Sequence, residues 1–303
     1  MKSFQGHYIH LSFVSNNMYL SFTVADLTPH GMLPLAYGLS QGGPTGIVTA
    51  VALAAIFGAG SAYSMTNYAY MAELTRTNSI GEMWSVLLGQ DSKWMAEVSI
   101  FSLCFGCCIF YSAFVGDIFS SVASAVGITG LFARRWAILG LISACIFAPL
   151  CLLEDLSALQ VSSTIGVTGI AYTVLFHLAR LLDGSYASGG KFFEALPESG
   201  RPHWSTASKS LLAGKFKLFS ANQGTLSLVN ILCVGFLAHY NAINYSKELE
   251  NTSPRRYRDA ITYGFGITFI VFASMMILGY CIFGDAAQPL ILNNFHQTKD
   301  TLV

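Results

Sequence analysis

Polar side chains interrupt one apolar segment of this sequence, LVNILCVGFLAHYNAINYSKEL, residues 228–249. His239 can exchange a proton near neutral pH, and the amide of Asn241 can both donate and accept hydrogen bonds. A polar group that faces lipid without a partner costs several kcal/mol. Side chains of these types therefore predict contact with a ligand, an ion or water. Their chemistry suits ligand binding or proton transfer.

Asp117 is a second candidate for proton chemistry, because it follows directly on the charge-free run 98–116. A carboxylate within a membrane segment is costly and by default suggests a function. Asp117 also falls within about one helical turn of the expected membrane surface, where water would solvate it. For His239, a purely structural hydrogen bond is the competing role. Both alternatives stay open.

The remaining reactive side chains fit structural roles. His177 and Arg180 lie one turn apart near the end of an apolar run, where arginine can reach the headgroups and anchor the helix. The cysteines of CFGCC (104–108) share a helix face, but neither a histidine nor a second cysteine pair completes a metal site. Motifs for phosphate binding, metal binding or nucleophilic catalysis are missing. We therefore predict no enzymatic activity and no cofactor.

The composition indicates which elements position these residues. Of 303 residues, 53% are hydrophobic and only 11% are charged, against about 25% charged in soluble domains. Charge-free stretches of roughly membrane length recur along the chain, at 31–72, 98–116, 136–153, 156–179, 218–246 and 260–284. Backbone in lipid must pair internally, so the fold class is an all-α polytopic membrane protein in a lipid bilayer. A net charge of zero gives no sign of a nucleic-acid partner, and we predict no obligate protein partner.

We expect complete spans near 45–71, 94–119, 136–153, 159–182 and 259–283. The pair Glu154 and Asp155 predicts a tight link between antiparallel helices. Ser253 and Pro254 suit the start of the last span. Residues 1–30 receive no assignment, and 183–219 is expected to be a polar extramembrane loop. Two further segments are interrupted: 31–43, broken at Pro34, and 226–249.

The two interrupted segments are separated by about four ordinary spans, as expected if a unit is repeated upside down. Inverted-repeat secondary transporters bind substrate and coupling ion at unwound backbone near the membrane midplane. We therefore expect Gly235 to let its helix open and the freed backbone groups to line a wet cavity. A seven-helix receptor is disfavoured, because the first segment is broken.

The segment GFLAHYNAINYSKEL resembles the sixth helix of the amino acid/auxin permeases, and SPRRYRDAITYGFGITFIVFASMMILGYCIFGD resembles the seventh. GMLPLAYGLSQGG is similar to the second half of the first helix. The resemblance implies a LeuT-like inverted-repeat bundle that transports neutral amino acids with H⁺ or Na⁺. Residues 31–303 would then be a partial transporter domain, truncated after the seventh helix, and the chain looks incomplete.

The resemblance also implies a substrate site at opened backbone of the first and sixth helices, with third-helix side chains. The residues that match these places are Gly31, Met32, Phe110, Tyr111, Gly235, Phe236, His239 and Asn241. His239 and Asp117 are the candidates for proton coupling. The host membrane would be vacuolar, lysosomal or plasma membrane. Two alternatives stay open: an amino acid sensor without net transport, and a non-functional truncated product.

Overall fold

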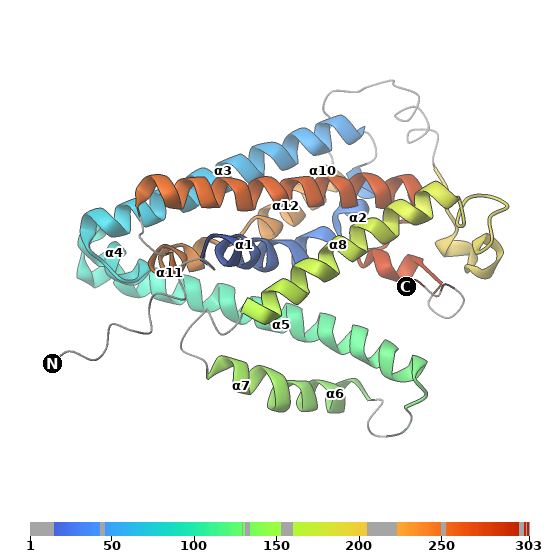
Figure 1. Cartoon of the computed structure of the whole chain (residues 1–303), viewed down its shortest axis with the longest axis horizontal. Helices are drawn as coiled ribbons and strands as arrows, with labels where there is room; N and C mark the ends of the chain where they lie inside the picture. The colour runs from blue at the N-terminus through green and yellow to red at the C-terminus, as the bar shows by residue number, and fades with distance from the viewer. Residues whose placement is uncertain are drawn as a thin grey trace. The chain divides into compact units, whose positions relative to one another are not determined.

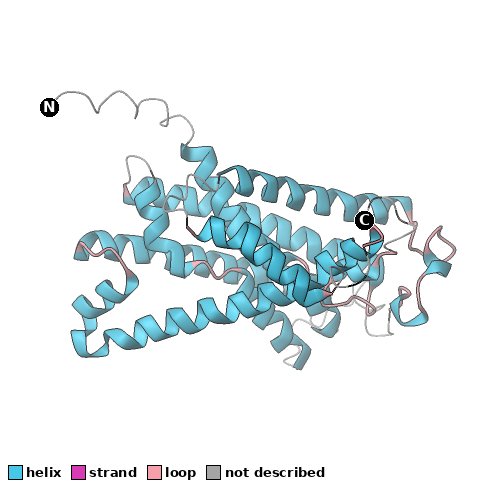
Figure 2. Cartoon of the chain, turned by 90° about the horizontal axis from the view of Figure 1, so that it is seen from below, coloured by secondary structure: helices cyan, strands magenta, loops and turns pink. Residues whose placement is uncertain are grey.

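The computed structural model describes residues 15–42, 46–128, 130, 134–152, 160–204, 223–249, 253–296, 300 and 302. Over these residues the chain forms helices joined by loops, without a β-strand (Figure 2). Within the described ranges, five helical segments are long and apolar enough to cross a membrane, at Gly46–Thr75, Gln90–Ser120, Ser162–Asp183, Gly224–Lys247 and Pro254–Phe283. The protein is therefore an all-α, multi-pass integral membrane protein, as predicted.

The chain divides into two compact units. The first is built from both ends of the chain, up to Ala69 and from Val161 onward, and the second is the middle portion, Tyr70–Gln160. The predicted link at Glu154 and Asp155 lies outside the described residues.

Helix α12 (Pro254–Phe283) organises the first unit. Its start is the predicted one: the Ser253 hydroxyl accepts a hydrogen bond from the amide of Arg256 at 3.2 Å, and proline occupies the first helical position. Helices α1 (Ser15–Met32) and α2 (Leu35–Gly42) pack along it (Figure 1). Positions along α12 can therefore be used to place the residues of α1 and α2 along the length of this unit.

Helix α1 forms where the sequence left residues 1–30 unassigned. It contains Pro29, which lacks a backbone donor, and it ends before Leu33 and Pro34, which interrupt the helix as predicted. Its contacts with α12 explain why it forms despite Pro29, because helices in proteins are stabilised mostly by packing of one face.

Glycines set the register between these helices. A Cβ atom added at Gly264 would lie 2.6 Å from Cγ2 of Thr23, and one added at Gly279 would lie 2.6 Å from Cβ of Ala36. Because the residue numbers rise together on both sides, α1 and α2 run parallel to α12. Residues near position 26 therefore lie level with the middle of α12.

The second interruption also lies where it was predicted. Helix α10 (Gln223–Gly235) ends at Gly235, and a single 3-10 turn, η8 (His239–Asn241), leads into the short helix α11 (Ala242–Glu248). The three residues between α10 and η8 follow no regular helix. Gly235 is thus the last residue of the first half-helix.

The two broken helices run in opposite directions. Leu228, early in α10, contacts Gly38 in α2, whereas Gly235 at the end of α10 contacts Gly31 in α1. The path of α10 is therefore antiparallel to that of α1 and α2 (Figure 1). Both chain breaks fall in this antiparallel pair.

The second unit contains α4 (Ile80–Leu88), α5 (Lys93–Ala125), α6 (Arg135–Ile142) and α7 (Ala148–Cys151). The span predicted at 136–153 is not one regular helix, because a π-helical segment, Ser143–Phe147, joins α6 to α7. Pro149 cannot donate to the carbonyl four residues earlier, which explains the local change in hydrogen bonding.

Candidate functional site

The two chain breaks meet at a pair of glycines. A Cβ atom added at Gly31 would lie 2.9 Å from the Cα atom of Gly235, and one added at Gly235 would lie 3.4 Å from the Cα atom of Gly31. The backbones of α1 and α10 can approach this closely because neither residue carries a side chain. Two residues more than 200 positions apart, both predicted to belong to one site, are therefore neighbours.

Phe272 of α12 fills the space beside these glycines. Its ring would lie 2.9 Å from a Cβ atom added at Gly235, and it contacts the Phe236 ring at a centroid separation of 4.9 Å. Phe236 and Phe272 are both fully buried. The expectation of an open, wet cavity at this point is therefore wrong for this conformation, because an aromatic side chain packs into the gap that two glycines leave.

Helix α3 (Gly46–Thr75) covers the second break from another side. Gly58 faces the ring of Phe236, and a Cβ atom added there would lie 3.2 Å from it. The His239 ring is hydrogen-bonded to the backbone of Ser61 and lies edge-on to Tyr68, with ring centroids 6.0 Å apart. The structure thus places His239 against α3, in the structural surroundings that were the alternative to proton coupling.

Asp26 is a residue that the sequence analysis missed. The hydroxyls of Tyr240 and Tyr245 donate to its carboxylate at 3.1 and 2.7 Å, and the amide Nδ2 of Asn241 donates at 3.3 Å. Asp26 is half-buried and lies on α1 between the contacts made by Thr23 and Gly31. One carboxylate of the first broken helix therefore holds three side chains that follow the break in the second. An isolated acid in the apolar stretch 18–36 was the available signal.

Buried polar atoms near this level lack partners. The hydroxyls of Thr28 on α1 and Thr268 on α12 are fully buried without a hydrogen bond to any described residue, and so is the Nδ1 atom of His239. Buried polar groups are nearly always hydrogen-bonded, so each exception needs an explanation. Their common position along α1, α12 and η8 fits a region that binds small polar groups.

The other predicted residues fall into two groups. Met32 is buried at the end of α1, and Asn241 bonds to Asp26. Phe110 and Tyr111 lie on α5 in the second unit, both exposed, with their rings in edge contact at 5.7 Å. Six of the predicted residues thus gather around the two breaks, and these two belong to the other unit.

Asp117 also lies on α5 and is an ion-pair partner. Its carboxylate is 3.2 Å from Nη2 of Arg135, which also donates to the carbonyl of Ala113 at 2.8 Å. The Asp117 and Arg135 side chains are 60% and 49% exposed. The pair therefore ties α6 to α5 at an accessible position.

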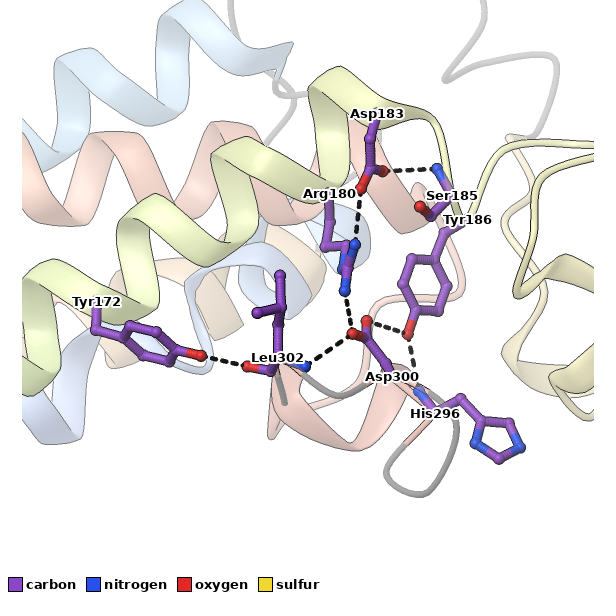
Figure 3. A network of polar contacts seen from close by, with 8 residues as sticks. All are labelled: Tyr172, Arg180, Asp183, Ser185, Tyr186, His296, Asp300 and Leu302. Carbon is purple, nitrogen blue, oxygen red and sulfur yellow. Dashed lines mark hydrogen bonds and ion pairs between the residues drawn. The ribbon is translucent and has the colours of Figure 1, made fainter.

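A second polar cluster lies at the far end of α8 (Gln160–Asp183), and Figure 3 shows it. Arg180 forms ion pairs with Asp183 at 2.7 Å and with Asp300, whose side chain is fully buried. The hydroxyl of Tyr186 donates to Asp300 at 2.9 Å, and the amide of Leu302 donates to the same carboxylate at 3.1 Å. The predicted role of Arg180 as a headgroup anchor is wrong, because its side chain is only 10% exposed and both partners are protein carboxylates.

This cluster fixes the segment that follows α12. Tyr186 also accepts a hydrogen bond from the amide of His296 at 3.0 Å, and Tyr172 donates to the carbonyl of Leu302 at 2.6 Å (Figure 3). Burial raises the pKa of Tyr186, and its hydrogen bond to Asp300 acts in the same direction. Tyr186 therefore stays a neutral donor at any physiological pH.

Comparisons with known proteins agree with the geometry. The model of the family "transmembrane amino acid transporter protein" matches residues 23–303. The chain is 24% identical over 230 residues to amino acid transporter AVT6E of Arabidopsis thaliana. The aligned region covers 74% of this chain and 44% of that protein. It is 25% identical over 207 residues to vacuolar amino acid transporter 5 of Schizosaccharomyces pombe, covering 67% of this chain and 43% of that one.

The chain thus spans a little under half the length of these curated relatives. No solved structure is significantly similar to it. The family model covers almost the whole chain, including both broken helices, α12 and the segment that α8 holds. The resemblance noted in the sequence is confirmed, and the chain belongs to the transmembrane amino acid transporter protein family.

Proposed function

We propose that the protein is a secondary active transporter of neutral amino acids, driven by a gradient of H⁺ or Na⁺. Substrate binds where the two broken helices meet, and the site is exposed to one side of the membrane and then to the other. The observation that carries this proposal is the contact of Gly31 with Gly235, which joins two oppositely directed, interrupted helices. Interrupted helices of opposite direction are typical of inverted-repeat transporters.

The substrate's charged ends need polar partners at this level of the molecule. The half-helix ends near Met32 and Gly235 offer backbone groups, and His239 and Asn241 offer side chains. The buried hydroxyls of Thr28 and Thr268, which bond to no described residue, support the same location. Phe110 and Tyr111 on α5 remain proposed substrate contacts.

Phe272 sets the condition for binding. Its ring occupies the space between the glycines and Phe236, so an amino acid can enter only if this ring turns away or α12 moves relative to α1. In the conformation described here, the Phe272 ring therefore closes the proposed site. Since a packed core changes between discrete arrangements, one ring can act as a barrier between two states.

The name of the fission yeast relative supports a vacuolar or lysosomal membrane, with the plasma membrane as the alternative. His239 and Asp117 remain proposed coupling residues, although His239 bonds to Ser61 and Asp117 pairs with Arg135. Coupling through either side chain would require these contacts to break during the cycle.

Uptake into liposomes tests the function. The protein, reconstituted in sealed vesicles, is expected to accumulate a labelled neutral amino acid when an inward H⁺ or Na⁺ gradient is imposed. Phe272→Ala should change the apparent affinity, because the barrier to the site is removed. Saturable binding without accumulation under either gradient would point to a sensor and would contradict transport.

A further inference from the structure

Asp26 carries a negative charge that no cation of the described chain balances. Its three hydrogen-bond donors are two phenols and an amide, all neutral. In the described part of the chain, no lysine, arginine or histidine nitrogen forms an ion pair with it, whereas Asp117, Asp183 and Asp300 each have an arginine. A carboxylate held only by neutral donors lacks the partner that normally stabilises it away from water.

The depth of Asp26 makes this charge costly. Thr23 contacts Gly264 and Gly31 contacts Phe272, so Asp26 lies level with the middle of α12, a helix that crosses the membrane. An ionised side chain at the centre of a bilayer is energetically unfavourable and by default suggests a function. A mobile cation that arrives and leaves during the cycle would remove this cost in one state and restore it in the other.

The neighbourhood favours a proton over a metal ion. Tyr240, Asn241 and Tyr245 all point hydrogens at the carboxylate, whereas Na⁺ needs several oxygen atoms turned toward it. On the facing sides of the packed helices, α12 presents Gly264, Thr268 and Phe272, and α8 presents Gly166 to Ala25. Among the residues that the structure describes, the titratable groups in contact with Asp26 are the two tyrosines.

We infer that Asp26 is the proton-binding group of the transport cycle. This inference rests on the proposed function and adds a coupling residue to the candidates His239 and Asp117. A proton from water on the side to which the site is open forms an O–H bond at Oδ1, the oxygen with a single described hydrogen bond, and the Tyr240 hydroxyl turns from donor to acceptor. The same O–H bond breaks after the site opens to the other side.

Protonation changes what holds the second broken helix. Oδ2 of the ionised group accepts from both Asn241 and Tyr245. Hydrogen bonds to a charged group are roughly twice as strong as those between neutral groups. Loss of the charge therefore weakens the link from α1 to η8 and α11 and favours their separation.

Infrared difference spectroscopy tests proton binding without transport. Acidification of the reconstituted protein should produce a carboxylic C=O band that Asp26→Asn removes, that Asp26→Glu retains, and that Asp259→Asn leaves unchanged. Asp259 is the matched control, a carboxylate near the start of α12 with a side chain 51% exposed. An acid-induced spectrum that is identical in wild type and Asp26→Asn overturns the inference.

Transport in the same vesicles tests coupling. Asp26→Asn is expected to lose accumulation driven by a pH gradient while it still exchanges labelled for unlabelled substrate. Asp259→Asn should keep both activities. Full pH-driven accumulation by Asp26→Asn, or accumulation that follows only a Na⁺ gradient in the wild type, contradicts the inference. If the wild type moves no amino acid, the proposed function fails by itself, and the Asp26 band still decides proton binding.

Discussion

Asp26 and Asp300, two carboxylates of the same unit, are held in opposite ways. Asp300 is fully buried and forms an ion pair with Arg180, with further hydrogen bonds from Tyr186 and Leu302. Asp26 is half-buried and receives hydrogen bonds from neutral donors of η8 and α11. The first arrangement is internally neutralised, whereas the second includes no ion pair with a described residue.

This difference between the two carboxylates indicates where the molecule can move. Breaking a buried ion pair leaves an uncompensated charge, so the segment that Arg180 and Asp300 tie to α8 is expected to move as one body with it. The contacts of Asp26 can weaken by gain of a single proton. We therefore expect that separating the two broken helices at Asp26 requires less free energy than separating the segment around Asp300 from the end of α8.

The largest effect is expected from Arg180→Met. It leaves the buried Asp300 carboxylate without a cation, which should lower the free energy of unfolding by about 3–5 kcal/mol. Thermal unfolding in detergent measures the loss. Arg135→Met is the matched control, because the half-exposed pair of Arg135 with Asp117 should contribute less than about 1 kcal/mol. Equal losses of stability in the two variants would mean that the buried pair of Arg180 with Asp300 contributes no more than the half-exposed pair of Arg135 with Asp117.

The next effect concerns the contact of the breaks. Gly235→Ala pushes a methyl group to 2.9 Å from the Phe272 ring, so we expect a loss of about 1–3 kcal/mol in stability and slower uptake. Phe272→Leu should restore part of the loss, because the clashing ring is gone. Gly60→Ala on α3 is the control: nothing lies within 4 Å of the added atom, so helix propensity alone should keep or raise stability. Similar losses at both glycines would argue against the close approach.

A smaller effect is expected from Tyr257→Phe. The buried Tyr257 hydroxyl donates to the carbonyl of Ala242 at 3.0 Å and ties α11 to α12. Its loss should cost about 1 kcal/mol, seen as faster hydrogen exchange across 242–249. Tyr263→Phe, at a position 70% exposed, should leave exchange in this segment unchanged. Unchanged exchange in both variants would mean that Tyr257 does not hold α11.

The smallest effect at neutral pH belongs to the ionisation of Tyr186. Its pKa in the folded protein is raised above the unfolded value, so its contribution is fully present below pH about 10 and is lost as pH rises further. The wild type should lose up to about 1.4 kcal/mol per pH unit above that point relative to Tyr186→Phe. Unfolding temperatures of both proteins between neutral pH and pH about 10.5 measure the difference. Parallel curves would contradict a buried, neutral Tyr186.

Local sequence patterns predicted much of the fold. Ser253 and Pro254 marked the start of α12, and Gly235 marked the end of α10, because caps and helix ends depend on neighbouring residues. The helix over residues 15–32 was missed, since its stability comes from contacts with α12 rather than from its own composition. The π-helical segment at 143–147 was missed because it depends on where one proline falls within a helix.

The site was predicted only in outline. The glycine pair could be foreseen as two halves of one site, because interrupted segments imply a common break. The hydrogen bonds of Asp26 join residues 214 to 219 positions apart, and the bond of Arg180 to Asp300 spans 120, so no local pattern contains them. The position of the Phe272 ring is a matter of packing, which depends on three helices at once.

A cryo-EM map of the reconstituted protein with a bound neutral amino acid would show where the substrate binds. Density for the amino acid is expected between the breaks at Gly31 and Gly235, with the Phe272 ring displaced from the position between them. Continuous helix through residues 236–241, or substrate bound away from both glycines, would contradict it.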